Sequence, residues 1–65
     1  MEFSDKHSHI LERGYIVKAD ETEDNNAFQG PIVGFDSVYV FVQDPEGNIY
    51  NMFDYELELV EIPFK

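Results

Sequence analysis

The chain has 65 residues, enough for one domain, and 14 Asp and Glu against 4 Lys and Arg give it a formal net charge of -10. It contains no cysteine, which excludes disulfide bonds and thiolate metal sites within the chain. Because nucleic-acid binding needs cations that neutralise phosphates, this charge balance predicts no direct binding to DNA or RNA. The chain has no long apolar segment and no N-terminal signal region, so we expect a soluble, cytoplasmic protein with no membrane partner.

A weak helical pattern precedes the main part of the chain. One His and three apolar residues fall at i, i+4, i+7 and i+8, which is one face of a helix: Phe3, His7, Ile10 and Leu11. Gly14 would end such a helix in the left-handed conformation. The pattern leaves two interpretations of residues 1–13, a short helix or an ordered arm, and places the domain itself at residues 14–65.

From Tyr15 onward the pattern has a period of two, which is typical of β-strands. Residues 20–26 are polar throughout and predict a solvated loop. The strands that we expect, bounded by Gly, Pro and Asp, cover residues 15–19, 32–35, 38–42, 49–53 and 56–62.

The strongest local signal is a hairpin around residues 43–48. Asp44, Pro45 and Gly47 stand where a type I turn followed by a glycine bulge needs them, with Gly47 at positive φ. Pairing Asp44 with Asn48 then fixes the register. On one face it places Val42 opposite Tyr50 and Val40 opposite Met52, and on the other Phe41 opposite Asn51 and Tyr39 opposite Phe53.

Both faces of this hairpin are rich in large apolar side chains, whereas a hairpin with one solvated face alternates apolar with polar residues. We therefore expect the second face to be covered as well. Three kinds of cover remain open: the N-terminal segment, closure of a barrel, or another molecule.

The layout over residues 14–62 resembles that of the SH3-like small β-barrels. Three segments carry the resemblance: Gly14-Tyr15-Ile16-Val17-Lys18, Gly30-Pro31-Ile32-Val33-Gly34 and Asp54-Tyr55-Glu56-Leu57-Glu58-Leu59-Val60. The resemblance implies a mainly β fold with five strands, a long first loop and a short turn before the last strand. Proteins of this group bind peptides, nucleic acids or other proteins, and the members that bind RNA are basic.

Residues that bear chemistry do not form a recognisable catalytic or metal motif. His7 and His9, with Asp5 beside them, carry donor atoms that suit zinc or nickel, but no further ligand follows at a typical spacing. The acidic loop at residues 20–31 lacks the Gly and Glu of a calcium loop. We therefore expect no enzyme activity, no metal and no cofactor.

Interaction with a protein remains as the function that the composition favours. The acidic residues and the outer aromatic residues are the candidate contacts, namely Glu21, Glu23, Asp24, Tyr39, Phe41, Phe53, Tyr55, Glu56, Glu58 and Glu61. The excess of negative charge suggests a nucleic-acid mimic, such as a phage-type accessory protein or inhibitor that occupies a basic surface of its partner. The alternative is an assembly role, in which the aromatic face is buried in a homo-oligomer.

Overall fold

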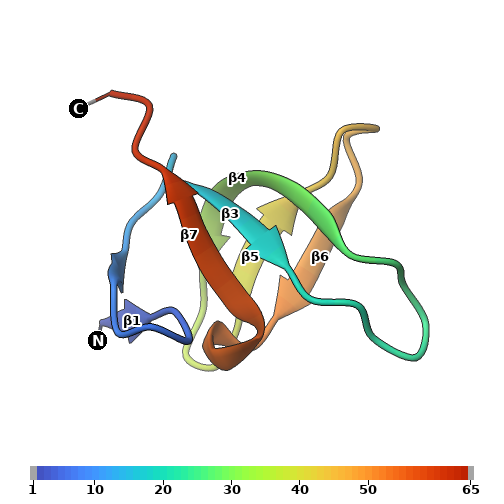
Figure 1. The fold of residues 1–65 in the computed structure, drawn as a ribbon, viewed down its shortest axis with the longest axis horizontal. Coiled ribbons are helices and arrows are strands. Elements are labelled where there is room, and N and C mark those ends of the chain that lie inside the picture. The colour runs from blue at the N-terminus through green and yellow to red at the C-terminus, as the bar shows by residue number, and fades with distance from the viewer. Residues whose placement is uncertain (1, 65) are drawn as a thin grey trace.

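The computed structural model describes residues 2–64, which form a mainly β fold with antiparallel strand pairs (Figure 1). The strands are β1 Phe3–Ser4, β2 Ile10–Leu11, β3 Ile16–Ala19, β4 Phe28–Phe35, β5 Val40–Gln43, β6 Ile49–Met52 and β7 Leu57–Glu61. A 3-10 helix, η1 Asp54–Glu56, precedes β7. No helix in this range has the length and apolar character needed to cross a membrane.

Five strands form one sheet in the order β6-β5-β4-β3-β7, and β1 and β2 form a separate hairpin. The long strand β4 joins the two halves of the sheet, because its first half pairs with β3 and its second half with β5. A register shift between Ile32 and Gly34 bends the strand. In Figure 1, β3 and β7 lie in front of β5 and β6, and all four strands contribute buried apolar side chains to the core.

The core consists of side chains from the inward faces of these strands together with the N-terminal hairpin. Alternation along each strand explains the set, since every second residue of β3 and β5 is buried. The buried apolar residues are Phe3, Leu11, Val17, Ala19, Ile32, Val40, Val42, Met52 and Leu57.

The hairpin between β5 and β6 has the predicted turn and register. Val40 pairs with Met52, and Val42 pairs with Tyr50. The Asp44 N–H donates to the Asn48 carbonyl over 2.9 Å. Gly47 lies at φ +93°. The local turn chemistry was therefore sufficient to fix which side chains face the core.

Strand β4 begins four residues earlier than the sequence indicated, because Gly30-Pro31 lies inside it and does not end it. Gly30 is buried, and a Cβ on it would overlap the carbonyl oxygen of Gln43. Pro31 lies where β4 changes its partner from β3 to β5. The sheet therefore needs no hydrogen bond from the backbone nitrogen of this residue.

Of the two interpretations of residues 1–13, the short helix is wrong, since residues 3–11 form the β1–β2 hairpin. Phe3 pairs with Leu11 across the hairpin, and both enter the core. Asp5 disfavours a helix here, because its side chain accepts backbone N–H groups of the turn. Ser8 also lies at φ 68°, outside the helical region. Gly14 does have positive φ, but in the turn that leads into β3.

The N-terminal hairpin covers the inner face of the sheet, where Phe3 stacks on Phe35 with ring centroids 5.3 Å apart. It is not the cover that the outer face of β5 and β6 was expected to need. On that face η1 contributes the side chain of Tyr55.

Candidate functional site

An aromatic patch lies on the outer face of β5 and β6; we use this name for Tyr39, Phe41, Phe53 and Tyr55. Phe53 is its centre, with ring centroids 5.0 Å from Tyr39 and 5.3 Å from Tyr55. The rings of Phe53 and Tyr55 are nearly parallel, at an interplanar angle of 9°. Phe41 shares the face and lies against Gly34, but forms no ring contact with the other three among the described residues. The structure thus brings three of the four predicted aromatic residues into one stack.

Two short polar motifs hold the stack in place. Asp36 Oδ1 accepts the N–H groups of Val38 at 2.7 Å and Tyr39 at 2.6 Å, and these hydrogen bonds lower the pKa of Asp36. Glu56 Oε1 accepts the Phe53 N–H at 2.9 Å and so fixes η1 against the end of β6. Both carboxylates therefore belong to the frame of the patch.

The patch presents apolar surface to solvent although the core is already closed beneath it. Tyr55 is 64% exposed, and Tyr39 and Phe53 are half-buried. Inside the sheet, Val40 and Val42 are fully buried. The outer aromatic residues are therefore not needed to fill the interior, and exposed aromatic side chains of this kind dominate many protein interfaces.

The predicted acidic residues fall into two groups with different surroundings. Glu21, Glu23 and Asp24 are exposed in the loop between β3 and β4, as expected. In the second group Glu61 is exposed, whereas the Glu56 carboxylate accepts a hydrogen bond from the Phe53 N–H. Glu58 lies 4.0 Å from the ring of His7. Glu56 is thus part of the framework rather than a freely solvated charge.

Charge is distributed unevenly along the chain. Eleven of the 14 acidic residues lie in residues 19–64, where the sequence contains no Lys, Arg or His. The cations of the described chain precede this region, and Lys6 is held by Asp20 at 2.6 Å. The segment that bears the aromatic patch, residues 39–55, therefore has only negative charges of its own.

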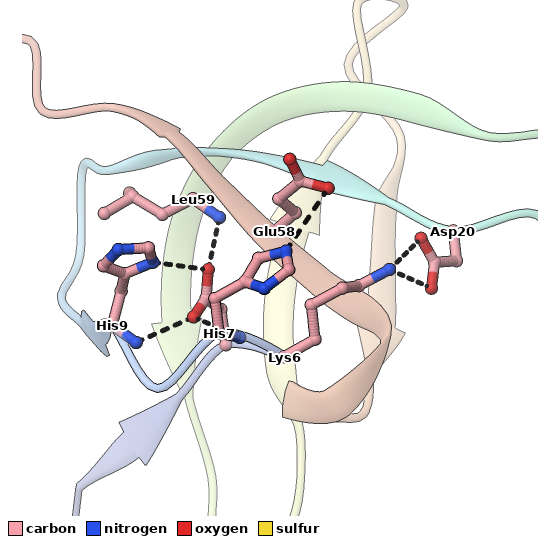
Figure 2. A network of polar contacts seen from close by, with 7 residues as sticks. Lys6, His7, His9, Asp20, Glu58 and Leu59 are labelled. Atoms are coloured by element: carbon pink, nitrogen blue, oxygen red, sulfur yellow. Dashed lines mark hydrogen bonds and ion pairs between the residues drawn. The ribbon is translucent and has the colours of Figure 1, made fainter.

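A polar network at the N-terminal hairpin was not identified from the sequence (Figure 2). Its centre is Asp5, which is 5% exposed. One carboxylate oxygen accepts the N–H groups of His7 at 3.0 Å and His9 at 2.8 Å. The other accepts the Leu59 N–H of β7 at 2.7 Å and contacts the His9 ring at 3.1 Å.

These contacts control both the ionisation of Asp5 and the position of the hairpin. Burial alone would raise the pKa of Asp5, but the hydrogen bonds from Leu59, His9 and His7 outweigh it and lower the pKa to about 2. The Lys6 N–H also donates to the Leu57 carbonyl over 3.0 Å, so the hairpin is attached along the outer edge of β7. An Asp side chain often accepts the backbone N–H of the residue two positions later, and this contact is typical of a turn. The partner Leu59 has no such local signal, because it lies 54 residues away.

The histidines of this network do not assemble a metal centre. The ring centroids of His7 and His9 are 6.3 Å apart, and His9 Nδ1 is directed at Asp5. Within residues 2–64 no three metal-ligating side chains come together.

A shallow cavity of about 290 Å³ lies at the other end of β6, between the β3–β4 loop and the β5–β6 turn. Phe28 and Tyr50 line it with ring centroids 4.8 Å apart, and its polar lining includes Asp24, Asp44 and Glu46. Burial raises the pKa of Tyr50, and the neighbouring Asp44 carboxylate raises it further. This end of the molecule is therefore also strongly negative.

Comparison of the chain with protein-family models, with curated proteins and with solved structures gave no significant match.

Proposed function

We propose that this protein is a non-catalytic protein-interaction module whose aromatic patch docks on a positively charged surface of a partner protein. The proposal includes an SH3-like arrangement of the main sheet. Its support is the strand order, in which β3 to β6 follow one another and β7 returns beside β3. The long acidic loop after β3 and the short η1 before β7 agree with that layout.

The observation that carries the proposal is the cluster of Tyr39, Phe53 and Tyr55 outside a closed core, in which Tyr55 is 64% exposed and the other two are half-buried. Aromatic side chains supply large contact area, and their faces attract ammonium and guanidinium groups. Asp54 lies between Phe53 and Tyr55 in the sequence, and Asp36 accepts the Tyr39 N–H, so both carboxylates add negative charge near these rings. A partner surface with basic residues around an apolar centre would satisfy both features. Basic surfaces that otherwise bind nucleic acid are of this kind, and occupying one would make the protein an accessory factor or inhibitor.

The experiment compares two variants that each remove one exposed aromatic side chain. Tyr55 in the patch and Phe64 outside it are 64% and 65% exposed, so Tyr55→Ala and Phe64→Ala are matched in exposure. Both are tested on an array of peptides graded in positive charge. We expect binding to rise with peptide charge and to fall about tenfold in Tyr55→Ala, as for the loss of a hot-spot contact, with little change in Phe64→Ala.

Two results would contradict the proposal. One is that no basic peptide binds above background, and the other is that both variants bind equally well. Sedimentation at several concentrations tests the alternative role: a dimer that Tyr55→Ala dissociates would show that the patch serves self-assembly.

A further inference from the structure

The two edges of the five-stranded sheet are treated differently. At β7 the N-terminal hairpin covers the edge, because Lys6 donates to the Leu57 carbonyl and Leu59 donates to Asp5. Exposed edges are templates for additional strands, and covering them is a common protection. At β6 the described chain provides no such cover.

The register identifies which main-chain groups of β6 are open. The Asp44–Asn48 bond and the pairs that follow it direct the backbone of Tyr50 and Met52 toward β5. The N–H and C=O groups of Ile49 and Asn51 therefore point away from the sheet. Both residues are exposed, and within residues 2–64 these groups have no hydrogen-bond partner outside the β5–β6 pair. The open stretch ends at Phe53, whose N–H is bound by Glu56.

The open edge is continuous with the aromatic patch. Side chains alternate along a strand, so Ile49, Asn51 and Phe53 share the outer face, while Tyr50 and Met52 face the core. Ile49 is 58% exposed. A strand added at β6 would place every second side chain on this outer face, beside Phe53.

Charge decides which kind of strand fits. Asp44 and Glu46 flank one end of β6, and Asp54 and Glu56 flank the other, with no cation in the same part of the sequence. A second copy of the chain would bring like charges together, which is unfavourable across paired strands. A segment rich in Lys or Arg would neutralise them.

We propose that the edge of β6 accepts an extended, positively charged segment of a partner protein as an added strand, with alternate side chains of that segment resting on the outer face. This inference rests on the proposed function and specifies how the partner binds. Main-chain hydrogen bonds to Ile49 and Asn51 would provide affinity, and the aromatic patch would select among side chains.

The test uses a defined probe, a capped peptide of alternating lysine and valine, and a second peptide with alternate backbone nitrogens methylated. Asn51→Pro removes an outward N–H without removing a bond to β5, and a proline is tolerated at such an edge position. Asn51→Ala keeps the N–H and is the matched control. We expect affinity to fall about tenfold for Asn51→Pro and for the methylated peptide, and less than about twofold for Asn51→Ala.

Amide hydrogen exchange followed by NMR gives a readout that does not depend on a variant. The Ile49 and Asn51 amides of the unmodified protein should exchange rapidly when free and become protected when the peptide is bound. Binding without this protection would overturn the inference, whether or not Asn51→Pro folds.

The remaining outcomes separate this inference from the proposed function. If Asn51→Pro binds normally but Tyr55→Ala does not, the added strand is wrong and the aromatic docking surface stands. If this peptide fails to bind the unmodified protein, the inference is overturned, and the proposed function is overturned with it only if the peptides graded in positive charge also fail to bind. If the two amides become protected without peptide as protein concentration rises, a second copy occupies the edge and the basic occupant is wrong.

Discussion

Asp5 is the residue whose side chain connects the most distant parts of the chain. Its buried carboxylate accepts hydrogen bonds from the turn of the N-terminal hairpin and from Leu59 in β7. A buried carboxylate is costly unless its hydrogen-bonding capacity is satisfied, and here both oxygens are. The hairpin therefore depends on the ionised form of one side chain.

The first prediction concerns the stability of the fold at low pH. Asp5 has a folded-state pKa of about 2 against an ordinary value of 3.8, so its contribution is present above pH 3.8 and is lost as the pH falls toward 2. The shift corresponds to about 2 kcal/mol of unfolding free energy. Denaturant titrations across this range should show the loss. Asp5→Asn replaces one acceptor oxygen by an NH2 group that faces backbone N–H donors, so it should lower the free energy of unfolding by about 2–3 kcal/mol at pH 7. It should also remove this part of the pH dependence of stability. An unchanged pH profile in Asp5→Asn would contradict the assignment.

A second prediction at this scale concerns Gly47, which lies at φ +93° with open space around it, since the nearest atom to a Cβ would be Gln43 Nε2 at 3.9 Å. Substitution therefore tests backbone strain alone. Gly47→Val should cost about 1–2 kcal/mol, because a β-branched residue resists positive φ. Gly47→Asn, which tolerates this region better, is the control. Equal melting temperatures for Gly47→Val and the parent would show that the turn does not hold the hairpin.

Among the elements, the N-terminal hairpin has the least regular structure and yet contributes two core residues. Phe3 and Leu11 are 8% and 4% exposed, and Phe3 stacks on Phe35 of β4. The hairpin also contacts β7 through Lys6 and Asp5. We therefore expect it to unfold together with the sheet.

A third prediction follows for this element. Phe3→Ala should destabilise the whole fold by about 3 kcal/mol or more, as expected for a large-to-small substitution of a buried aromatic residue. Chemical denaturation followed by both far-UV circular dichroism and tyrosine fluorescence measures the effect. Separate transitions for the two signals would mean that the hairpin folds independently of the sheet.

The β5–β6 hairpin was predictable because its determinants are adjacent in the sequence: Asp44 and Gly47 set the turn, and the turn sets the register. The N-terminal hairpin was not predictable in the same way, since Asp5 finds Leu59 only after the chain has folded. The full length of β4 also depends on a tertiary contact, the approach of Gly30 to Gln43.

The candidate site shows the same division. Alternation along β5 and β6 placed Tyr39, Phe41 and Phe53 on one face from the sequence alone. That Tyr55 joins Phe53 depends on the position of η1, which Glu56 fixes through the Phe53 N–H. The sequence alone predicts Glu56 to be a surface charge, whereas the structure gives its carboxylate a structural role.

For the molecule as a whole, the charge of -10 is spread over a body with a radius of gyration of 10.5 Å. That dimension is close to the screening length of about 8 Å at physiological ionic strength, so the negative field extends beyond the surface and is sensitive to salt. Such a field accelerates encounters with basic partners and disfavours nucleic acid. A random DNA duplex should accordingly show no shift on mixing with the protein.

The fourth prediction concerns the rate of partner binding. Neutralising Glu21, Glu23 and Asp24 together, or Glu58 and Glu61 with Glu56 left intact, should slow association of the lysine–valine peptide and change its dissociation little. Stopped-flow measurements at several salt concentrations give both rates. The fold should persist, because these changes relieve self-repulsion. Association that ignores salt and both sets of substitutions would show that the acidic residues do not guide recognition.

The placement of the two chain ends has a practical consequence for attachment. In Figure 1 strand β1 and the segment that follows β7 both lie on the left side of the molecule, while β6 lies toward the right. A tag, a fused domain or a surface tether joined at either end would extend away from the open edge. The protein is thus suited to immobilisation by either end, with β6 left accessible to the solution.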